Sequence, residues 1–210
     1  MLQRGKLGYS LRMNPPRPHL ADKLPYPVEL VQRWTLHDGT RVVIRPIRPE
    51  DRQIEQDFVH NLSDESRYYR FFNAIRDLSE SALTRFTQVD YDRDMALIAV
   101  ISENGRETQI GVARYSINPD GRSCEFAIAV ADAWQRKGIG SKLLHNLMDA
   151  ARRRGLATME GSVLSGNARM MALMDGLGFT VDASAGDPTV RHVVRNLTTR
   201  VTPAGATETR

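Results

Sequence analysis

Runs of apolar or alternating residues in the first two thirds of the chain predict β-strands, and these runs lie at 41–47, 95–101, 109–117 and 124–130. The turn His37-Asp-Gly39 precedes the first run. The other three runs are separated by Asn104-Gly105 and Asp120-Gly121, dipeptides that favour tight hairpin turns. These three runs are therefore expected to form an antiparallel meander.

Apolar residues spaced three and four positions apart predict helices. Helix starts are expected at Pro49-Glu-Asp51, Ser63-Asp64 and Ser79. The longest stripe lies within 138–154 and ends before Gly155, a residue type common just after helices. Its members are Ile139, Leu143, Leu144, Leu147, Met148 and Ala151. The remaining pattern predicts a strand, a helix and two last strands, at 158–164, 167–177, 179–181 and 190–197.

Length and composition indicate one globular domain with extensions. The chain has 210 residues, of which 41% are hydrophobic and 26% are charged, close to globular averages. We expect a basic, proline-rich N-terminal extension at 1–26, a folded domain at 27–201 and a flexible tail at 202–210.

The net charge of +4 belongs to the N-terminal extension. Against the single acid Asp22, residues 1–27 carry Arg4, Lys6, Arg12, Arg17 and Lys23. Such an arm is usually solvated. Because the sequence shows no base-stacking aromatics or groove-reading helix beside it, a nucleic-acid partner is not expected.

The sequence pattern also excludes several other classes of protein. It has no run of about 18 uncharged apolar residues that would predict a membrane span. The single cysteine, Cys124, cannot form an intrachain disulfide, and the N-terminus lacks the apolar segment of a secretory signal. We therefore expect a cytoplasmic protein. The five histidines share no ligand spacing, and the Asp90 to Asp94 stretch lacks the glycine and glutamate of a calcium loop, so no metal is expected.

The most informative stretch joins the predicted strand 124–130 to the predicted helix that starts near Gly138. Several backbone N–H groups near Gly138 and Gly140 would point outward at the positive end of the helix dipole. Glycine permits the close approach of a phosphate, and nearby positive charge comes from Arg136, Lys137 and Lys142. The pattern predicts an anion site, although two glycines at this spacing are also typical of a plain tight turn.

Gln135-Arg-Lys-Gly-Ile-Gly140 resembles the Q/R-x-x-G-x-G/A signature of the GNAT superfamily of N-acetyltransferases, and Asn167 through Gly178-Phe179 resembles its later N-to-GF segment. The resemblance implies an α/β (α+β) fold whose mixed, mostly antiparallel central sheet is flanked by helices and splayed at the acetyl-CoA site. It also implies that acetyl-CoA is the co-substrate and that a backbone loop holds its pyrophosphate, formed by Gln135, Arg136, Lys137, Gly138, Ile139, Gly140 and Ser141. By the same resemblance, main-chain atoms of Ile128 and Val130 bond the pantetheine and the acetyl carbonyl, and Asn167 lies near the pantetheine arm.

A closer likeness spans about 26–197. The segments around 39–49, 65–72 and 90–99 are similar to the acetyltransferase domain of bacterial protein-lysine acetyltransferases. This likeness implies a lysine-bearing protein as the acceptor. It also implies that the helix with Arg67 to Phe72 borders the substrate groove, whereas its mixed charge and aromatic content alone would predict ordinary amphipathic packing.

Glu125 is the candidate catalytic base. In a strand, Glu125, Ala127 and Ala129 share one face, and the small alanines leave room beside the carboxylate. A partly desolvated carboxylate suits the removal of a proton from an ammonium nucleophile, and the related enzymes have a glutamate at this place. An exposed strand glutamate is the alternative. Cys124 faces the other way, so a covalent acetyl-cysteine is not favoured.

The general acid and the acceptor contacts are less well specified. Many GNAT members place a tyrosine where this chain has Met174, so we assign no general acid and note only Tyr68, Tyr91 and Tyr115 as candidates. Asp90 and Tyr91 are expected to bind the substrate, because an acidic loop before a core strand would attract a lysine. A solvated turn is the alternative.

The leading hypothesis is an acetyl-CoA-dependent N-acetyltransferase in which a protein lysine attacks directly, with Glu125 as the base. An enzyme of the same fold acting on a small amine is the first alternative. The second is a non-catalytic acyl-CoA-sensing module that regulates a partner.

Overall fold

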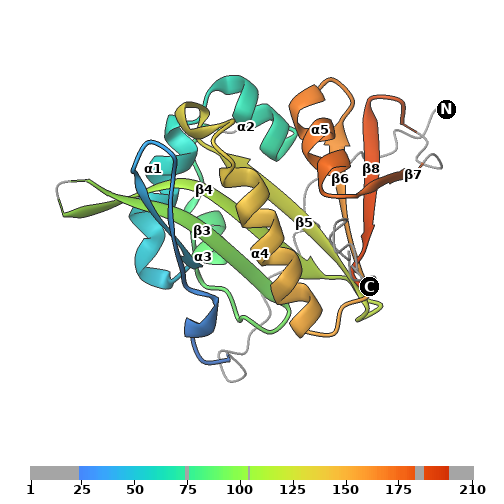
Figure 1. Ribbon diagram of the computed structural model, residues 1–210, viewed down its shortest axis with the longest axis horizontal. Coiled ribbons are helices and arrows are strands. Elements are labelled where there is room, and N and C mark those ends of the chain that lie inside the picture. Colours follow the sequence, from blue (N-terminus) through green and yellow to red (C-terminus); the bar gives the residue numbers. More distant parts are fainter. Residues whose placement is uncertain (1–23, 74–75, 104, 183–186, 199–210) are drawn as a thin grey trace, which may run out of the picture.

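The computed structural model describes residues 24–73, 76–103, 105–182 and 187–198. Within these residues, eight strands form one sheet in the order β1-β2-β3-β4-β5-β6-β8-β7 (Figure 1). The strands are β1 (Gln32–Thr35), β2 (Arg41–Pro46), β3 (Asp94–Glu103), β4 (Arg106–Ile117), β5 (Ser123–Val130), β6 (Thr158–Leu164), β7 (Thr180–Asp182) and β8 (Val190–Asn196). The α-helices are α1 (Arg52–Asn61), α2 (Asp64–Phe71), α3 (Glu80–Thr87), α4 (Ile139–Arg153) and α5 (Ala168–Gly176). Most of the predicted N-terminal extension and the whole predicted tail lie outside the described residues.

Two neighbouring strands in the middle of the sheet, β5 and β6, diverge, as the family resemblance implied. Neighbouring strands of the sheet are antiparallel, except β5 and β6, which are parallel and connected by α4. Such a parallel pair needs a crossover connection, which the helix supplies. Pairing of β5 with β6 ends at Glu125 opposite Glu160, although β5 continues to Val130 and β6 to Leu164. The two strands therefore diverge toward their carboxyl ends.

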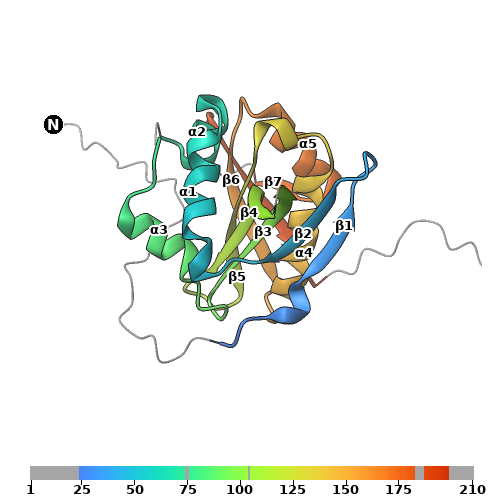
Figure 2. The same ribbon diagram turned by 90° about the vertical axis from the view of Figure 1, so that its left-hand side faces the viewer.

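Helix α4 covers one face of the sheet, and α1, α2 and α3 cover the other (Figure 2). The predicted apolar stripe of α4 is confirmed, because Ile139, Leu143, Leu144 and Leu147 are fully buried. The helix approaches the sheet closely at Gly111, where an added Cβ would lie 3.0 Å from the Leu143 Cδ1 atom. Glycine at this position lets α4 pack directly on the backbone of β4.

A buried ionic cluster joins α1 to β4 on the other face. The Glu55 carboxylate is 2% exposed and accepts hydrogen bonds from Arg114 Nη2 at 2.9 Å and from Gln109 Nε2 at 2.6 Å. The Arg114 guanidinium also lies over the Phe86 ring, 4.3 Å from its centroid. Both Glu55 oxygens are therefore satisfied, which a buried carboxylate requires.

The helices begin where the sequence predicted, but the first strand was not predicted. Ser63 and Ser79 cap α2 and α3 by accepting hydrogen bonds from backbone N–H groups of Ser66 and Ala82. Strand β1 was not predicted from the sequence; it is a four-residue edge strand whose residues are only half-buried or exposed. Such a strand lacks a buried apolar face, so its pairing with β2 determines its strand conformation.

Among the helices in the described part of the chain, none combines the length and the apolar character that a membrane span requires.

Candidate active site

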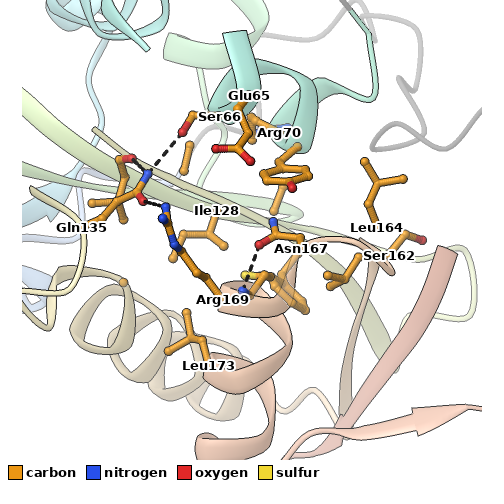
Figure 3. A pocket seen from close by; sticks show the side chains of 18 of the residues that line it. Glu65, Ser66, Arg70, Ile128, Gln135, Ser162, Leu164, Asn167, Arg169 and Leu173 are labelled. Atoms are coloured by element: carbon orange, nitrogen blue, oxygen red, sulfur yellow. Dashed lines mark hydrogen bonds between the residues drawn. The ribbon is translucent and has the colours of Figure 1, made fainter. Parts of the chain in front are cut away.

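A cavity of about 390 Å³ opens where β5 and β6 diverge, between α2 on one side and the starts of α4 and α5 on the other (Figure 3). Its wall combines charged and apolar side chains from segments far apart in the sequence. From α2 and the residue after it come Glu65, Ser66, Tyr69, Arg70 and Phe72. From β6 and α5 come Ser162, Val163, Leu164, Asn167, Arg169, Met170 and Leu173.

The loop between β5 and α4 lines one end of this cavity and offers backbone N–H groups to it. Arg136 and Gly138 have positive φ angles of 62° and 83°, and such left-handed turns direct successive backbone N–H groups toward one side. The first N–H groups of α4 have no helical acceptor, and no side chain of the N-cap residue Gly138 covers them. The cavity wall includes Gln135, Arg136, Gly138, Gly140 and Ser141.

Two residues of the predicted loop are directed elsewhere. The Lys137 Nζ atom lies 3.4 Å from Asp38 Oδ2 and 4.6 Å from the centroid of the Trp134 ring, and Lys137 does not line the cavity. Ile139 is fully buried in the core. The side chains of these two residues therefore anchor the loop, and their contribution to an anion site is limited to their backbone.

Strand β5 supplies the cavity wall along its whole divergent edge. Glu125, Ala127 and Ala129 pair with the β4 residues on the α1–α3 face, and all three line the cavity. Ile128 and Val130 point to the opposite face, where their methyl groups would lie 3.7 Å from a Cβ added to Gly140. Because β6 is no longer paired with this edge, residues on both faces of β5 line the cavity. Glu125 is half-buried there.

Helix α2 places two ionisable groups in the cavity wall, Arg70 and Tyr69. Burial, together with the Arg114 charge, lowers the pKa of Arg70 to about 9, and the Glu55 and Glu125 carboxylates oppose this change. Arg70 thus keeps its positive charge at neutral pH and interacts electrostatically with Glu125. Burial raises the pKa of Tyr69, and the hydrogen bond and charge of Glu65 raise it further. The Tyr69 hydroxyl donates to the Gly166 carbonyl oxygen at 3.4 Å, across the cavity from α2.

The tyrosines considered in the sequence analysis do not line the cavity, whereas Tyr69 does. Tyr91 and Tyr115 are 5% and 2% exposed and belong to the core, and Tyr68 is exposed on the outer side of α2. Met174, in the position where many GNAT members have tyrosine, is 1% exposed and also belongs to the core. The sequence placed Tyr69 in the groove-bordering segment, but only the fold distinguishes it from Tyr68.

The structure does not bring Asp90 and Tyr91 into the cavity wall. Asp90 Oδ1 accepts hydrogen bonds at 3.0 Å from the backbone N–H groups of residues 92–94. The Tyr91 hydroxyl donates to the Ile47 carbonyl oxygen at 2.7 Å, and its ring meets Tyr26 edge to face. Both side chains thus shape the turn before β3, which is separated from β5 by β4.

Asn167 and Cys124 have the local roles that their surroundings dictate. Asn167 lines the cavity and caps α5 by accepting a hydrogen bond from the Met170 N–H at 3.0 Å. Cys124 is fully buried, and burial together with the Glu160 and Asp120 charges raises the pKa of its thiol to about 12. A thiol in this state is a poor nucleophile at neutral pH.

Among the described residues, no group of histidine, cysteine and carboxylate side chains could hold a metal ion.

Comparison with known proteins assigns the class defined by this fold and site. A model of the acetyltransferase (GNAT) family matches residues 56–179, which is more than half of the chain, and the chain belongs to this family. It is therefore an acetyltransferase with acetyl-CoA as its co-substrate.

Three proteins of this family are similar to the chain over most of its length. The chain is 35% identical over 155 residues to acetyltransferase PA5475 of Pseudomonas aeruginosa, covering 74% of this chain and 83% of that protein. It is 28% identical over 155 residues to acetyltransferase Pat of Mycolicibacterium smegmatis, covering 73% of this chain but 44% of Pat. The GNAT domain of S. lividans PAT superposes with a TM-score of 0.74 at 30% identity, covering 82% of this chain and 99% of that domain.

The residues of the cavity fit acetyl-CoA. The start of α4 and the left-handed turns before it offer backbone N–H groups suited to a pyrophosphate. A Cβ added to Gly140 would lie 3.4 to 3.7 Å from Leu173, Ile128 and Val130, so glycine keeps this entrance free of a side chain. The exposed edge of β5 beyond Glu125 is suited to an extended pantetheine arm, which pairs with strand backbone as another strand would.

Proposed function

We propose that this chain transfers the acetyl group of acetyl-CoA to the ε-amino group of lysines in proteins, by direct attack with Glu125 as the base. The observation that carries the proposal is one cavity whose wall combines the loop suited to an anion with the Glu125 and Glu65 carboxylates. The likeness to the GNAT domain of S. lividans PAT supports it. The single cysteine makes no demand for an oxidising compartment, in keeping with a cytoplasmic reaction.

In this mechanism the chain holds the thioester and removes one proton. The Gln135 to Ser141 backbone binds the pyrophosphate, and the Ile128 N–H polarises the thioester carbonyl as it gains negative charge. Glu125 accepts a proton from the lysine ammonium, directly or through water, and frees the nitrogen lone pair. As the new C–N bond forms, the C–S bond breaks and the sulfur leaves with the bonding electrons.

Tyr69 is our candidate for the group that assists this departure. Its phenol lines the cavity and is protonated at neutral pH, because the ordinary tyrosine pKa of about 10 lies well above neutrality and the surroundings of Tyr69 raise it. It can therefore donate a hydrogen bond or a proton to the leaving thiolate, the role that Met174 cannot take.

The experiment that tests the function compares amine classes with purified protein and acetyl-CoA. Peptides with one internal lysine, peptides with a free N-terminal alanine and blocked lysines, and free amino acids and polyamines are assayed by mass spectrometry. We expect the lysine peptides and folded protein acceptors to be acetylated fastest. Turnover of a free amine orders of magnitude faster would replace the protein acceptor by a small molecule, and binding of acetyl-CoA without transfer to any amine would favour an acyl-CoA sensor.

A further inference from the structure

Helix α2 lines the cavity on the side where the proposed acceptor would bind, and few of its residues are buried in the domain. Of its eight residues, Arg67 and Phe71 are buried. Near its C-terminal end, the Phe71 ring stacks on Phe86 with a centroid distance of 6.5 Å. Its N-terminal end is attached by polar contacts to the segment that leads from β5 into the cofactor loop.

Asp132, in the short helix η4 (Asp132–Trp134), makes the first of these contacts. Its carboxylate accepts hydrogen bonds from the Ser63 backbone N–H at 2.9 Å, the Ser63 hydroxyl at 2.8 Å and the Ser66 hydroxyl at 2.7 Å. Burial opposes ionisation, but the bonds from Ser63 and Ser66 lower the pKa of Asp132 below its ordinary value. A carboxylate at a helix N-terminus is also favoured by the helix dipole.

Gln135 makes the second contact with the same serine (Figure 3). Its Nε2 atom donates to Ser66 Oγ at 3.2 Å and to the Val130 carbonyl oxygen at 3.2 Å. Its Oε1 atom accepts from Arg169 Nη1 at 3.2 Å. One amide side chain therefore joins α2 to the end of β5 and to α5, and the Ser66 hydroxyl contacts both Asp132 and Gln135.

We propose that Ser66, Asp132 and Gln135 are positioning residues that couple the cofactor loop to helix α2. Acetyl-CoA bound to the loop restrains Asp132 and Gln135, and their hydrogen bonds to Ser66 and Ser63 hold the start of α2. This orders the wall that carries Glu65, Tyr69 and Arg70. The acceptor site is thus completed when the co-substrate is bound. This inference rests on the proposed acetyl-CoA site.

Hydrogen–deuterium exchange tests the coupling without a known acceptor. Exchange is followed in segments 63–72 and 131–141 of the full chain, with and without acetyl-CoA. In the unmodified protein we expect acetyl-CoA to slow exchange in both segments. In Ser66→Ala the slowing in 131–141 is expected to persist while the slowing in 63–72 decreases. In Asp132→Ala, which also loses both bonds from Ser63, the slowing in 63–72 is expected to be largely lost.

The choice of Ser66→Ala separates coupling from simple stability. Alanine is the best helix former, so the substitution does not weaken α2 intrinsically, and the Ser63 cap with Asp132 is left in place. Ser81→Ala is the matched control, because Ser81 is exposed on α3 and its hydroxyl contacts Ser79. Asp132→Ala serves as a second variant, with Asp149→Ala, which removes an exposed carboxylate from α4, as its control.

Each outcome of this experiment has a defined meaning. Equal slowing of 63–72 in Ser66→Ala and in the unmodified protein removes Ser66 from the coupling. Equal slowing in Asp132→Ala as well overturns the coupling while leaving the acetyl-CoA site intact. Slowing of 131–141 alone in the unmodified protein does the same. Absence of slowing in both segments overturns the acetyl-CoA site itself, and the coupling with it.

Discussion

At the scale of single residues, the proposed chemistry depends on Glu125, whose position follows from the parting of two strands. Its register partner on β6 is Glu160, and beyond this pair the strands separate and the cavity begins. Arg70 interacts with Glu125 electrostatically from α2. Glu125, the proposed base, therefore lies where the sheet, the cavity and helix α2 meet.

Glu125→Gln keeps the shape of the side chain but removes its ability to accept a proton. A positioned base contributes about 10²- to 10⁴-fold, so kcat is expected to fall by that factor at pH 7, with little change in the Kd for acetyl-CoA. The deficit should shrink as the pH approaches the lysine pKa of about 10.4, because neutral lysine then needs no base. Kinetics and calorimetry measure both quantities.

Glu160→Gln is the matched control for this substitution, since Glu160 neighbours Glu125 but does not line the cavity. It is expected to retain the activity of the unmodified protein. Wild-type turnover of Glu125→Gln at pH 7 would remove Glu125 from the mechanism.

Tyr69→Phe tests the group that assists the leaving thiolate. Loss of the hydroxyl is expected to lower kcat by about tenfold or more, since a positioned proton donor contributes on this scale or above. The Kd for acetyl-CoA should change little. Steady-state kinetics is compared with Tyr68→Phe, which removes the hydroxyl of the neighbouring exposed tyrosine. If the two variants had the same kcat, Tyr69 would have no such role.

At the scale of elements, the loop before α4 favours glycine at position 138 because of its backbone conformation. Its φ of 83° strains any other residue, whereas an added Cβ would make only an ordinary contact with the Trp34 ring at 3.4 Å. Left-handed backbone costs a residue with a Cβ roughly 1–2 kcal/mol. Gly155, just after α4, has nearly the same φ of 82° but open space around it. The two glycines thus separate backbone strain from the binding of an anion.

Gly138→Asp is expected to raise the Kd for acetyl-CoA at least about tenfold, which corresponds to 1.4 kcal/mol, because it adds strain and a negative charge beside the pyrophosphate. Gly155→Asp, which has the strain without the proximity, should bind acetyl-CoA normally. Titration calorimetry with circular dichroism as the folding check distinguishes them. Unchanged affinity in folded Gly138→Asp would remove this loop from the binding site.

At the scale of the whole molecule, the Glu55 cluster connects the helical layer to the centre of the sheet. Glu55→Ala would leave Arg114 as a buried cation without its carboxylate, and such losses cost about 3–5 kcal/mol. Chemical denaturation should show this decrease in the free energy of unfolding. Glu80→Ala, which removes an exposed ion pair with Arg52, should cost less than about 1 kcal/mol. Equal effects of the two substitutions would contradict the structural role of the Glu55 cluster.

Much of the fold could be predicted because its signals are local. Caps at Ser63, Ser79 and Asn167 mark helix starts, and the apolar stripe of α4 alone predicts which of its faces is buried. Alternation along β5 is equally local, since successive side chains of a strand point to opposite faces. The grouping of Glu125 with Ala127 and Ala129 was therefore determined by the sequence, as was the glycine turn before α4.

Contacts between distant segments were decided only by the tertiary structure. Tyr69 lines the cavity and Tyr68 does not, because the docking of α2 selects which side of the helix faces β5. Lys137 turns from the cavity because Asp38, 99 residues away along the chain, pairs with it. Asp90 and Tyr91 lie outside the cavity because they belong to the turn before β3, which β4 separates from β5. Sequence periodicity specifies which face of an element is apolar, whereas the partner of each polar side chain depends on how the layers pack.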